Sequence, residues 1–337
     1  MKIFVFLATF IISYLLTPRL IRLSSRLSLV YTRKKGTLRS RTGPLMGGIS
    51  IFISFTVVTA LAFILSRGTM LGEYDFHYLG IVIGGSLMVV LGAYDDARKS
   101  SLSFKLLVQI LAVLCLIACG YRIRVLTWVF GGQIELGWWG VPILIAWLLA
   151  TTNSLALIDK VDGLACGIAG IAALTLFLAG LQGPPFVPVL ALALTAACAG
   201  FLRYNYYPAR IFPGSSGTMF LGFVLGALSV QGSFKITAGI TLLLPLLALL
   251  TALFNYFRRG DRHPQLHQRL LDLGYSPRQV VLMLYIVQVN LRAIALVMAY
   301  SDKFFSLLIF LLVGVMLYLL FKITEEFRRL ILGNPRE

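Results

Sequence analysis

Two pairs of carboxylates lie beside long apolar runs in this sequence, and they are the side chains best suited to do chemistry. Asp95 and Asp96 are adjacent, whereas Asp159 and Asp162 are three residues apart and share one face of a helical turn. Carboxylates are costly near a bilayer and usually mark a functional site there. With cations nearby they could hold Mg²⁺ and phosphate, because Mg²⁺ takes one or two carboxylates and completes its shell with phosphate oxygens and water.

Four polar loops carry these carboxylates and the cations that would accompany them. A single loop of this composition is more often plain solvated surface, but all four fall on one predicted side of the membrane, and this convergence favours a site. The loops lie near residues 95–105, 151–163, 203–217 and 256–279. Their cations include Lys105, Lys160, Arg203 and Arg210.

Long apolar stretches must position the loops. Hydrophobic residues make up 58% of the chain and charged residues 13%, and the mean hydropathy is +0.88, unlike a soluble globular protein. Stretches long enough to cross a bilayer recur throughout, so we expect an all-α polytopic membrane protein with about eleven transmembrane helices in a single bundle, 1–337. The expected spans are about 3–17, 46–66, 77–94, 103–119, 138–152, 163–181, 185–202, 217–231, 236–255, 280–300 and 303–321.

The distribution of positive charge predicts the orientation. Most of the 30 lysines and arginines fall in loops on one side if the N-terminus is placed outside, and such loops are normally cytoplasmic. The sequence therefore predicts an inner-membrane protein whose C-terminus and four polar loops face the cytoplasm. The net charge of +17 then reflects topology rather than nucleic-acid binding. Arg19, Arg22 and Arg26 suit either a helix lying on anionic headgroups or a plain topology anchor.

Two other features lie away from these loops. The predicted outer segment RVLTWVFGGQIELGWW alternates around Gly131 and Gly132, which predicts a small β-hairpin. Arg292 lies within the predicted span 280–300, near Gln288. Its side chain would either extend toward the outer interface or make a polar contact inside the bundle.

Four motifs carry a resemblance to a known family. In order they are DD followed by a lysine and LLVQ, then NSLALIDKVDGLA, YNYYPARIFPGSSGTMFLGF and LHQRLLDLGYSPRQ. In these motifs the chain resembles the polyprenyl-phosphate N-acetylhexosamine-1-phosphate transferases of glycosyltransferase family 4. That family includes the enzymes that start O-antigen, enterobacterial common antigen and teichoic acid synthesis, and the translocase of the first lipid intermediate of peptidoglycan. The resemblance covers about residues 40 to 285, and eleven helices suit the common-antigen type.

The resemblance implies a reaction and a set of site residues. The phosphate of polyprenyl (undecaprenyl) phosphate would attack the β-phosphorus of a UDP-N-acetylhexosamine and release UMP, with Mg²⁺ orienting the pyrophosphate. It implies catalytic roles for Asp95, Asp96, Asp159 and Asp162, of which Asp95, Asp96 and Asp162 would serve the metal. The substrate-binding residues would be Lys105, Asn153, Lys160, Arg203, Asn205, Arg210, His267 and Arg269.

The chain departs from the family pattern at several of these positions. Ser215 stands where the family turn Gly-Asp-x-Gly has its metal-binding aspartate, and a neutral hydroxyl is a much poorer Mg²⁺ ligand. Gly214 and Gly217 still permit the backbone of that turn. Ala156 replaces an asparagine, Lys160 replaces the glycine between the two aspartates, and Gln265 and Gln268 replace residues of a histidine-rich loop in which His267 stays in register.

These departures leave three classes of function. We expect a catalytically impaired or inactive homologue that still binds polyprenyl phosphate or a lipid-linked ligand, with a regulatory or scaffolding role in cell-envelope glycan synthesis and weak or absent Mg²⁺ binding. The alternative is an active Mg²⁺-dependent transferase with an altered metal site, in which Lys160 supplies counter-charge. A transporter is disfavoured because no inverted repeat is evident. Besides polyprenyl phosphate and membrane lipids, a UDP-sugar and another envelope-biosynthesis membrane protein are candidate partners.

Overall fold

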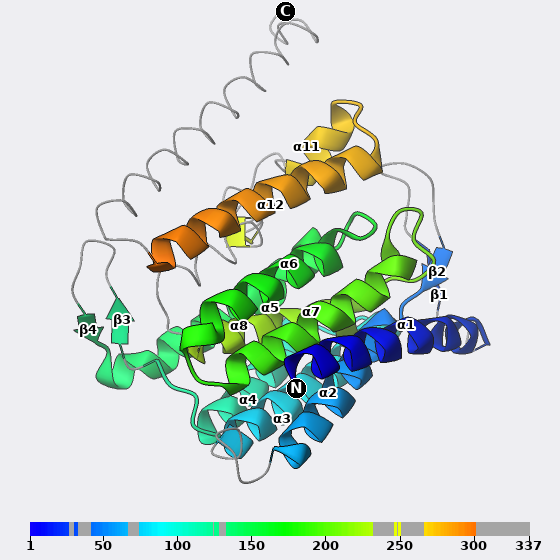
Figure 1. Ribbon diagram of the computed structural model, residues 1–337. Coiled ribbons are helices and arrows are strands. Elements are labelled where there is room, and N and C mark those ends of the chain that lie inside the picture. Colours follow the sequence, from blue (N-terminus) through cyan, green and yellow to red (C-terminus); the bar gives the residue numbers. More distant parts are fainter. Residues whose placement is uncertain are drawn as a thin grey trace, which may run out of the picture.

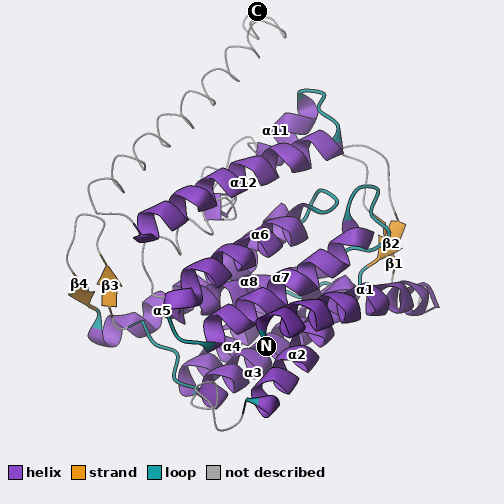
Figure 2. Cartoon of the chain, viewed as in Figure 1, coloured by secondary structure: helices purple, strands orange, loops and turns teal. Residues whose placement is uncertain are grey.

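A computed structural model describes residues 1–26, 30–32, 42–66, 74–123, 125–127, 133–231, 246–247, 249–250 and 266–300, and most of these residues are helical (Figure 2). The prediction of a mainly helical chain is therefore confirmed. The helices are α1 (Lys2–Arg26), α2 (Gly47–Leu65), α3 (Asp75–Arg98), α4 (Leu102–Ala118), α5 (Gly140–Ile158), α6 (Leu164–Ala179), α7 (Phe186–Asn205), α8 (Gly214–Gln231), α11 (Leu266–Asp272) and α12 (Pro277–Tyr300), with short 3-10 turns η2 (Gly137–Trp139) and η3 (Gly180–Gln182).

Several of these helices can cross a membrane. Within the described ranges, six segments are long and apolar enough by length and composition, and α4 is a shorter apolar helix. Helices α8 and α12 occupy the predicted spans 217–231 and 280–300. The spans predicted at 236–255 and 303–321 lie mostly or entirely outside the described residues. A multi-pass membrane protein is thus confirmed, and the total of eleven stays a prediction.

Helix α1 is longer than the predicted first span. It continues through Pro18 to Arg26, so residues 18–26 extend the first helix rather than forming a separate one. Its 25 residues reach about 37 Å at 1.5 Å per residue, more than the roughly 30 Å of bilayer hydrocarbon. Arg19, Arg22 and Arg26 are exposed on its last turns, where they suit the headgroup layer.

Two short antiparallel strand pairs lie at opposite ends of the bundle (Figure 1). Strand β1 (Val30–Thr32) pairs with β2 (Thr42–Pro44). Strand β3 (Val125–Thr127) pairs with β4 (Gln133–Glu135). Residues 128–132, around which the hairpin was expected, lie outside the described residues, so the hairpin as a whole stays a prediction.

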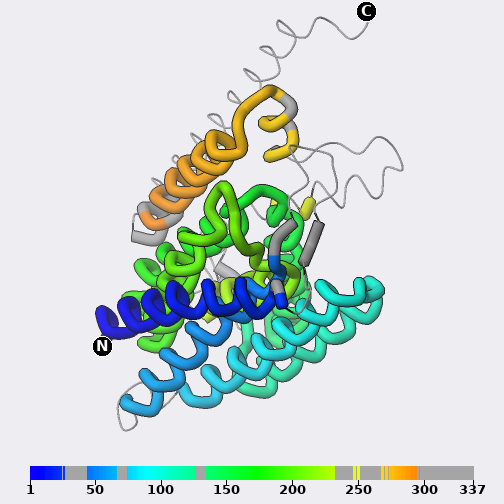
Figure 3. The backbone as a smooth tube through the Cα atoms, turned by 90° about the vertical axis from the view of Figure 1, so that its right-hand side faces the viewer, coloured from blue at the N-terminus to red at the C-terminus, as the bar shows by residue number. Residues whose placement is uncertain are grey.

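Helices α7 and α8 form the centre of the bundle. Nearly every residue of α8 is buried, whichever face it lies on, as expected for a core helix. Helix α8 packs against α3 and α5, and α7 packs against α1 and α6. Helix α12 lies on α6, on the side away from α2, α3 and α4 (Figures 1 and 3). The turn at Gly214 therefore begins a helix that is buried on all sides.

Arg292 makes its polar contacts inside the bundle. Its side chain is only 2% exposed, so the alternative in which it extends to the outer interface is wrong. Its Nε donates to Gln288 Oε1 at 2.9 Å, and its Nη2 lies 3.5 Å from the backbone oxygen of Ile168 on α6. An arginine from α12 thus reaches the backbone of α6 through the interior.

Candidate functional site

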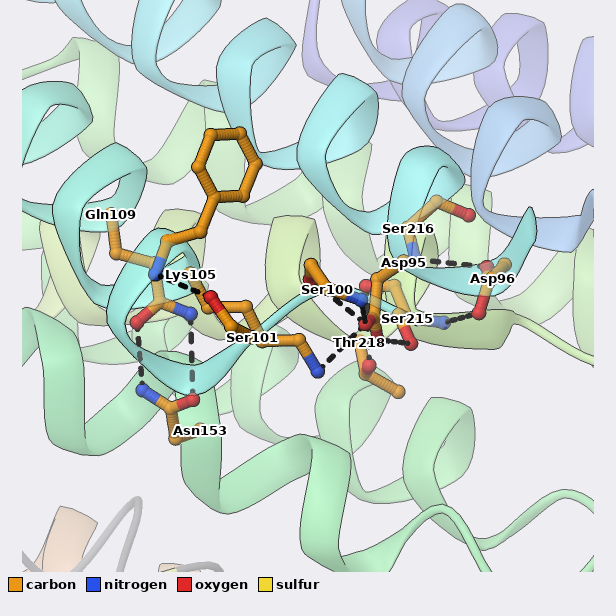
Figure 4. Close-up of polar contacts among 11 residues, drawn as sticks. Asp95, Asp96, Ser100, Ser101, Lys105, Gln109, Asn153, Ser215, Ser216 and Thr218 are labelled. Atoms are coloured by element: carbon orange, nitrogen blue, oxygen red, sulfur yellow. Dashed lines mark hydrogen bonds and ion pairs between the residues drawn. The ribbon is translucent and has the colours of Figure 1, made fainter. Parts of the chain in front are cut away.

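Asp95 lies where α3, α4 and α8 meet, and hydrogen bonds surround its carboxylate (Figure 4). One oxygen accepts from the backbone N–H and the hydroxyl of Ser100, both at 2.9 Å, and lies 2.8 Å from Lys105 Nζ. The other oxygen accepts from the hydroxyl of Ser215 at 3.0 Å. Because the side chain is only 4% exposed, the protein itself supplies most of its surroundings.

Asp96 caps the N-terminus of α8. One of its oxygens accepts from the backbone N–H of Ser215 at 2.9 Å and the other from that of Ser216 at 3.4 Å. The first N–H groups of a helix lack partners within the helix, and a negative charge is favourable there. Gly214 has φ +68, and a Cβ at this position would overlap the Asp96 carboxylate. The turn therefore requires glycine at 214.

This arrangement fits Mg²⁺ poorly. Ser215 donates to Asp95, whereas a carboxylate at 215 would repel Asp95 and call for a cation between them. Lys105 already places a positive charge against the same carboxylate. Across the described residues, no three His, Cys, Asp or Glu side chains form a group that could hold a metal ion. Asp162 is thus not grouped with Asp95 and Asp96, and the metal-binding roles of these residues stay predictions.

Asn153 pairs with Gln109, the last residue of the LLVQ motif, for which the sequence predicted no individual role. Asn153 Nδ2 donates to Gln109 Oε1 at 2.9 Å, and Gln109 Nε2 donates back to Asn153 Oδ1 at 3.4 Å. Gln109 is fully buried and joins α4 to α5. Its spacing of four residues from Lys105 places both side chains on one face of α4, and this spacing is the signal that could have assigned it a role. Whether Asn153 contacts substrate stays a prediction.

The two aspartates between α5 and α6 have different surroundings. Asp159 is the C-terminal cap of α5 and is partly exposed, and Lys160 beside it is exposed. Asp162 is only 6% exposed, and its Oδ2 accepts from the backbone N–H of Ala209 at 3.1 Å. Asp162 therefore ties the α5–α6 loop to the α7–α8 loop.

Two exposed arginines lie in and next to the α7–α8 loop. Asn205 is buried and its Nδ2 donates to the backbone oxygen of Ile211 at 2.8 Å, which closes the loop from within. Arg203 and Arg210 are exposed. Asn205 thus supports the loop here, while Arg203 and Arg210 offer positive charge at its surface.

The fourth predicted loop is described only in part. His267 lies in α11 and is 4% exposed. Arg269 belongs to the same helix, but its side chain and the whole of Gln265 lie outside what the structure describes. The structure therefore joins the first, second and third predicted loops through Asp95 and Asp162.

Comparisons with known proteins agree with this arrangement of motifs. Residues 78–233 match the family described as Glycosyl transferase family 4. The chain is 27% identical to a probable undecaprenyl-phosphate N-acetylglucosaminyl 1-phosphate transferase of Bacillus subtilis, over 95% of this chain and 91% of the relative. It is 30% identical to a decaprenyl-phosphate N-acetylglucosaminephosphotransferase of Mycolicibacterium smegmatis, over 82% and 77% of the two chains.

A third relative has a different transferred group in its name. The chain is 30% identical to a phospho-N-acetylmuramoyl-pentapeptide-transferase of Desulforudis audaxviator, over 85% of this chain and 95% of the relative. Two of these relatives are therefore 30% identical to the chain over more than three quarters of both sequences. The chain belongs to glycosyl transferase family 4.

Proposed function

We propose that this protein binds polyprenyl phosphate, or a product linked to it, at the cytoplasmic end of its bundle and acts in cell-envelope glycan synthesis. In this proposal the transfer of N-acetylhexosamine-1-phosphate from a UDP-sugar is impaired or lost. The names of the relatives support the carrier lipid and the reaction class, because they act on undecaprenyl or decaprenyl phosphate. The eleven-helix topology, the small outer hairpin and the outward N-terminus belong to the same proposal.

One contact carries the argument for impaired transfer. The hydroxyl of Ser215 donates to Asp95 at the position where the family resemblance implies a metal-binding carboxylate. With Lys105 on the other oxygen, the charge of Asp95 is neutralised by side chains of the protein. A carboxylate that is already paired with a lysine attracts a divalent cation less than an unpaired carboxylate does.

The exposed cations of the neighbouring loops support the lipid-phosphate half of the proposal. Lys160 and Arg210 are exposed on the two loops that Asp162 joins, and Arg203 is exposed in the last turn of α7. Guanidinium and ammonium groups bind phosphate oxygens through charge-assisted hydrogen bonds. A protein that holds the carrier without turning it over would regulate its supply or scaffold another membrane enzyme of the pathway.

The test combines turnover and binding on the purified full-length protein. UMP release from UDP-N-acetylglucosamine would be measured with polyprenyl phosphate and Mg²⁺, with the Mycolicibacterium smegmatis relative as the positive control. Polyprenyl phosphate binding would be measured by the shift in Tm, with uncharged polyprenol as the matched ligand control. We expect binding that requires the phosphate and no UMP release above background. A lack of phosphate-dependent binding would contradict the proposal.

A second candidate is an active sugar-1-phosphate transferase with an altered site. Similarity over 95% of this chain to the Bacillus subtilis relative favours it. In that case the phosphate of polyprenyl phosphate displaces UMP from the β-phosphorus of the UDP-sugar. Robust Mg²⁺-dependent UMP release in the same assay would establish this candidate and exclude an inactive protein.

A further inference from the structure

A hydroxyl on α12 contacts the loop that carries the two aspartates. Tyr285 Oη donates to the backbone oxygen of Gly163 at 2.6 Å. Gly163 directly follows Asp162 and precedes α6. The same oxygen accepts from the backbone N–H of Gly167 at 2.9 Å, in the first turn of α6. The phenol of Tyr285 therefore holds the backbone at the point where the loop becomes a helix.

The surface of α6 is shaped to receive this tyrosine. A Cβ on Gly167 would overlap the phenol group of Tyr285, so only glycine at 167 leaves room for the ring. Apolar side chains of α12 pack around it against α6 and the end of α5. They form one cluster that contains Ile158, Val161, Leu164, Ile168, Val280, Val281 and Leu284, with Tyr285 packed against it.

Helix α12 also contacts the second loop. The guanidinium carbon of Arg278 lies 5.4 Å from the centre of the Tyr207 ring, within the range of a cation–π contact. Tyr207 belongs to the α7–α8 loop, whose Ala209 donates to Asp162. Helix α12 thus contacts both loops, and the two loops are hydrogen-bonded to each other.

We propose that the first half of α12 is a clamp on the α5–α6 and α7–α8 loops and that Tyr285 is a positioning residue. By holding Gly163, Tyr285 keeps Asp162 on Ala209 and sets the separation between Lys160 on one loop and Arg210 on the other. These two cations are where a phosphate ligand would bind. The inference rests on the proposed function only for the identity of that ligand.

The first test measures the clamp itself, without a ligand. Tyr285→Phe removes the hydroxyl and keeps the ring. Tyr78→Phe is the matched control, because Tyr78 Oη also donates to a backbone oxygen, that of Thr56 at 3.2 Å. Tyr78 lies in the first turn of α3, at the opposite end of that helix from Asp95. Amide hydrogen exchange would be followed in the full-length protein. We expect the Ala209 N–H to exchange roughly three- to tenfold faster in Tyr285→Phe, the worth of one buried hydrogen bond, and to be unchanged in Tyr78→Phe.

A second variant, Gly167→Ala, and a second measurement, polyprenyl phosphate binding, distinguish failure of the clamp from failure of the proposed function. Gly167→Ala displaces the ring and is expected to speed exchange at Ala209 at least as much as Tyr285→Phe. Polyprenyl phosphate binding is expected to weaken in both variants and not in Tyr78→Phe. If the unchanged protein binds no polyprenyl phosphate, the proposed function fails while the exchange data still judge the clamp. Equal exchange at Ala209 in Tyr285→Phe, Tyr78→Phe and the unchanged protein would overturn the clamp.

Discussion

Ser215 and Asp95 share a 3.0 Å hydrogen bond between the start of α8 and the last turn of α3. The donor is a neutral hydroxyl and the acceptor is a carboxylate that also pairs with Lys105. This hydrogen bond joins the two core helices α8 and α3 directly. An aspartate at 215 would turn this attraction into a repulsion between two partly buried charges.

The first prediction exchanges this serine for the charged residue. Ser215→Asp is expected to lower Tm in the absence of Mg²⁺ and to regain part of the loss when Mg²⁺ is added, because the cation would screen the two carboxylates. The Tm of the unchanged protein is expected to change little when Mg²⁺ is added. The measurement is thermal unfolding in detergent with and without Mg²⁺. Ser215→Asn is the matched neutral control, and an equal Mg²⁺ response from both variants would contradict the prediction.

The second prediction concerns the ion pair of Lys105 with Asp95. Lys105→Met leaves a carboxylate that is 4% exposed without its cation. We expect the free energy of unfolding to fall by about 1.5–3 kcal/mol, the worth of a hydrogen bond to a charged group. Arg98→Met removes an exposed cation from the same end of α3. This control is expected to change the free energy of unfolding by less than about 0.5 kcal/mol. Denaturant unfolding of both variants measures these free energies. Equal losses in Lys105→Met and Arg98→Met would show that the Lys105–Asp95 ion pair adds no specific stability.

The third prediction addresses the paired amides of Gln109 and Asn153. Each single substitution to leucine leaves the other amide without its partner across the helices, whereas the double variant removes both. We expect the two losses in stability to be non-additive by about 1 kcal/mol. A double-mutant cycle measures this coupling. Gln109→Leu combined with Tyr78→Phe is the control pair and is expected to be additive.

The fourth prediction uses the buried guanidinium of Arg292. Gln288→Leu removes the acceptor of the Arg292 Nε and is expected to destabilise the protein by about 1–3 kcal/mol. Gln288→Glu keeps an acceptor and adds a counter-charge, so it is expected to be more stable than Gln288→Leu. Thermal unfolding of the two variants at neutral pH compares them. A less stable Gln288→Glu would show that the guanidinium does not depend on this acceptor.

The fifth prediction tests the orientation in the membrane. Trp138 precedes α5 and is 94% exposed, while Ser276 is exposed just before α12. A membrane-impermeant maleimide applied to intact cells is expected to label Trp138→Cys and to spare Ser276→Cys until the membrane is opened. The unchanged protein reports the background from its four cysteines. Labelling of Ser276→Cys in intact cells would reverse the proposed topology.

Length and charge along the chain were sufficient to predict where most described helices lie and which loops carry polar chemistry. The span expected at 185–202 corresponds to α7 and that at 46–66 to α2. These features are local, because bilayer thickness sets helix length and headgroup charge sets loop composition. The same local information missed the continuation of α1 through Pro18, since a proline constrains a helix without always ending it.

The partners of the polar side chains depended on the tertiary structure. Ser215 and Asp95 are 120 residues apart in the sequence, and no pattern in either motif shows that the hydroxyl contacts the carboxylate. Likewise, the sequence placed Asp162 beside Asp159 on one helical turn, whereas the fold directs Asp162 to Ala209 and leaves Asp159 at the end of α5. Helix ends from distant parts of the chain meet only after the bundle has packed. That packing decides which carboxylates support the structure and which cations stay exposed at the surface.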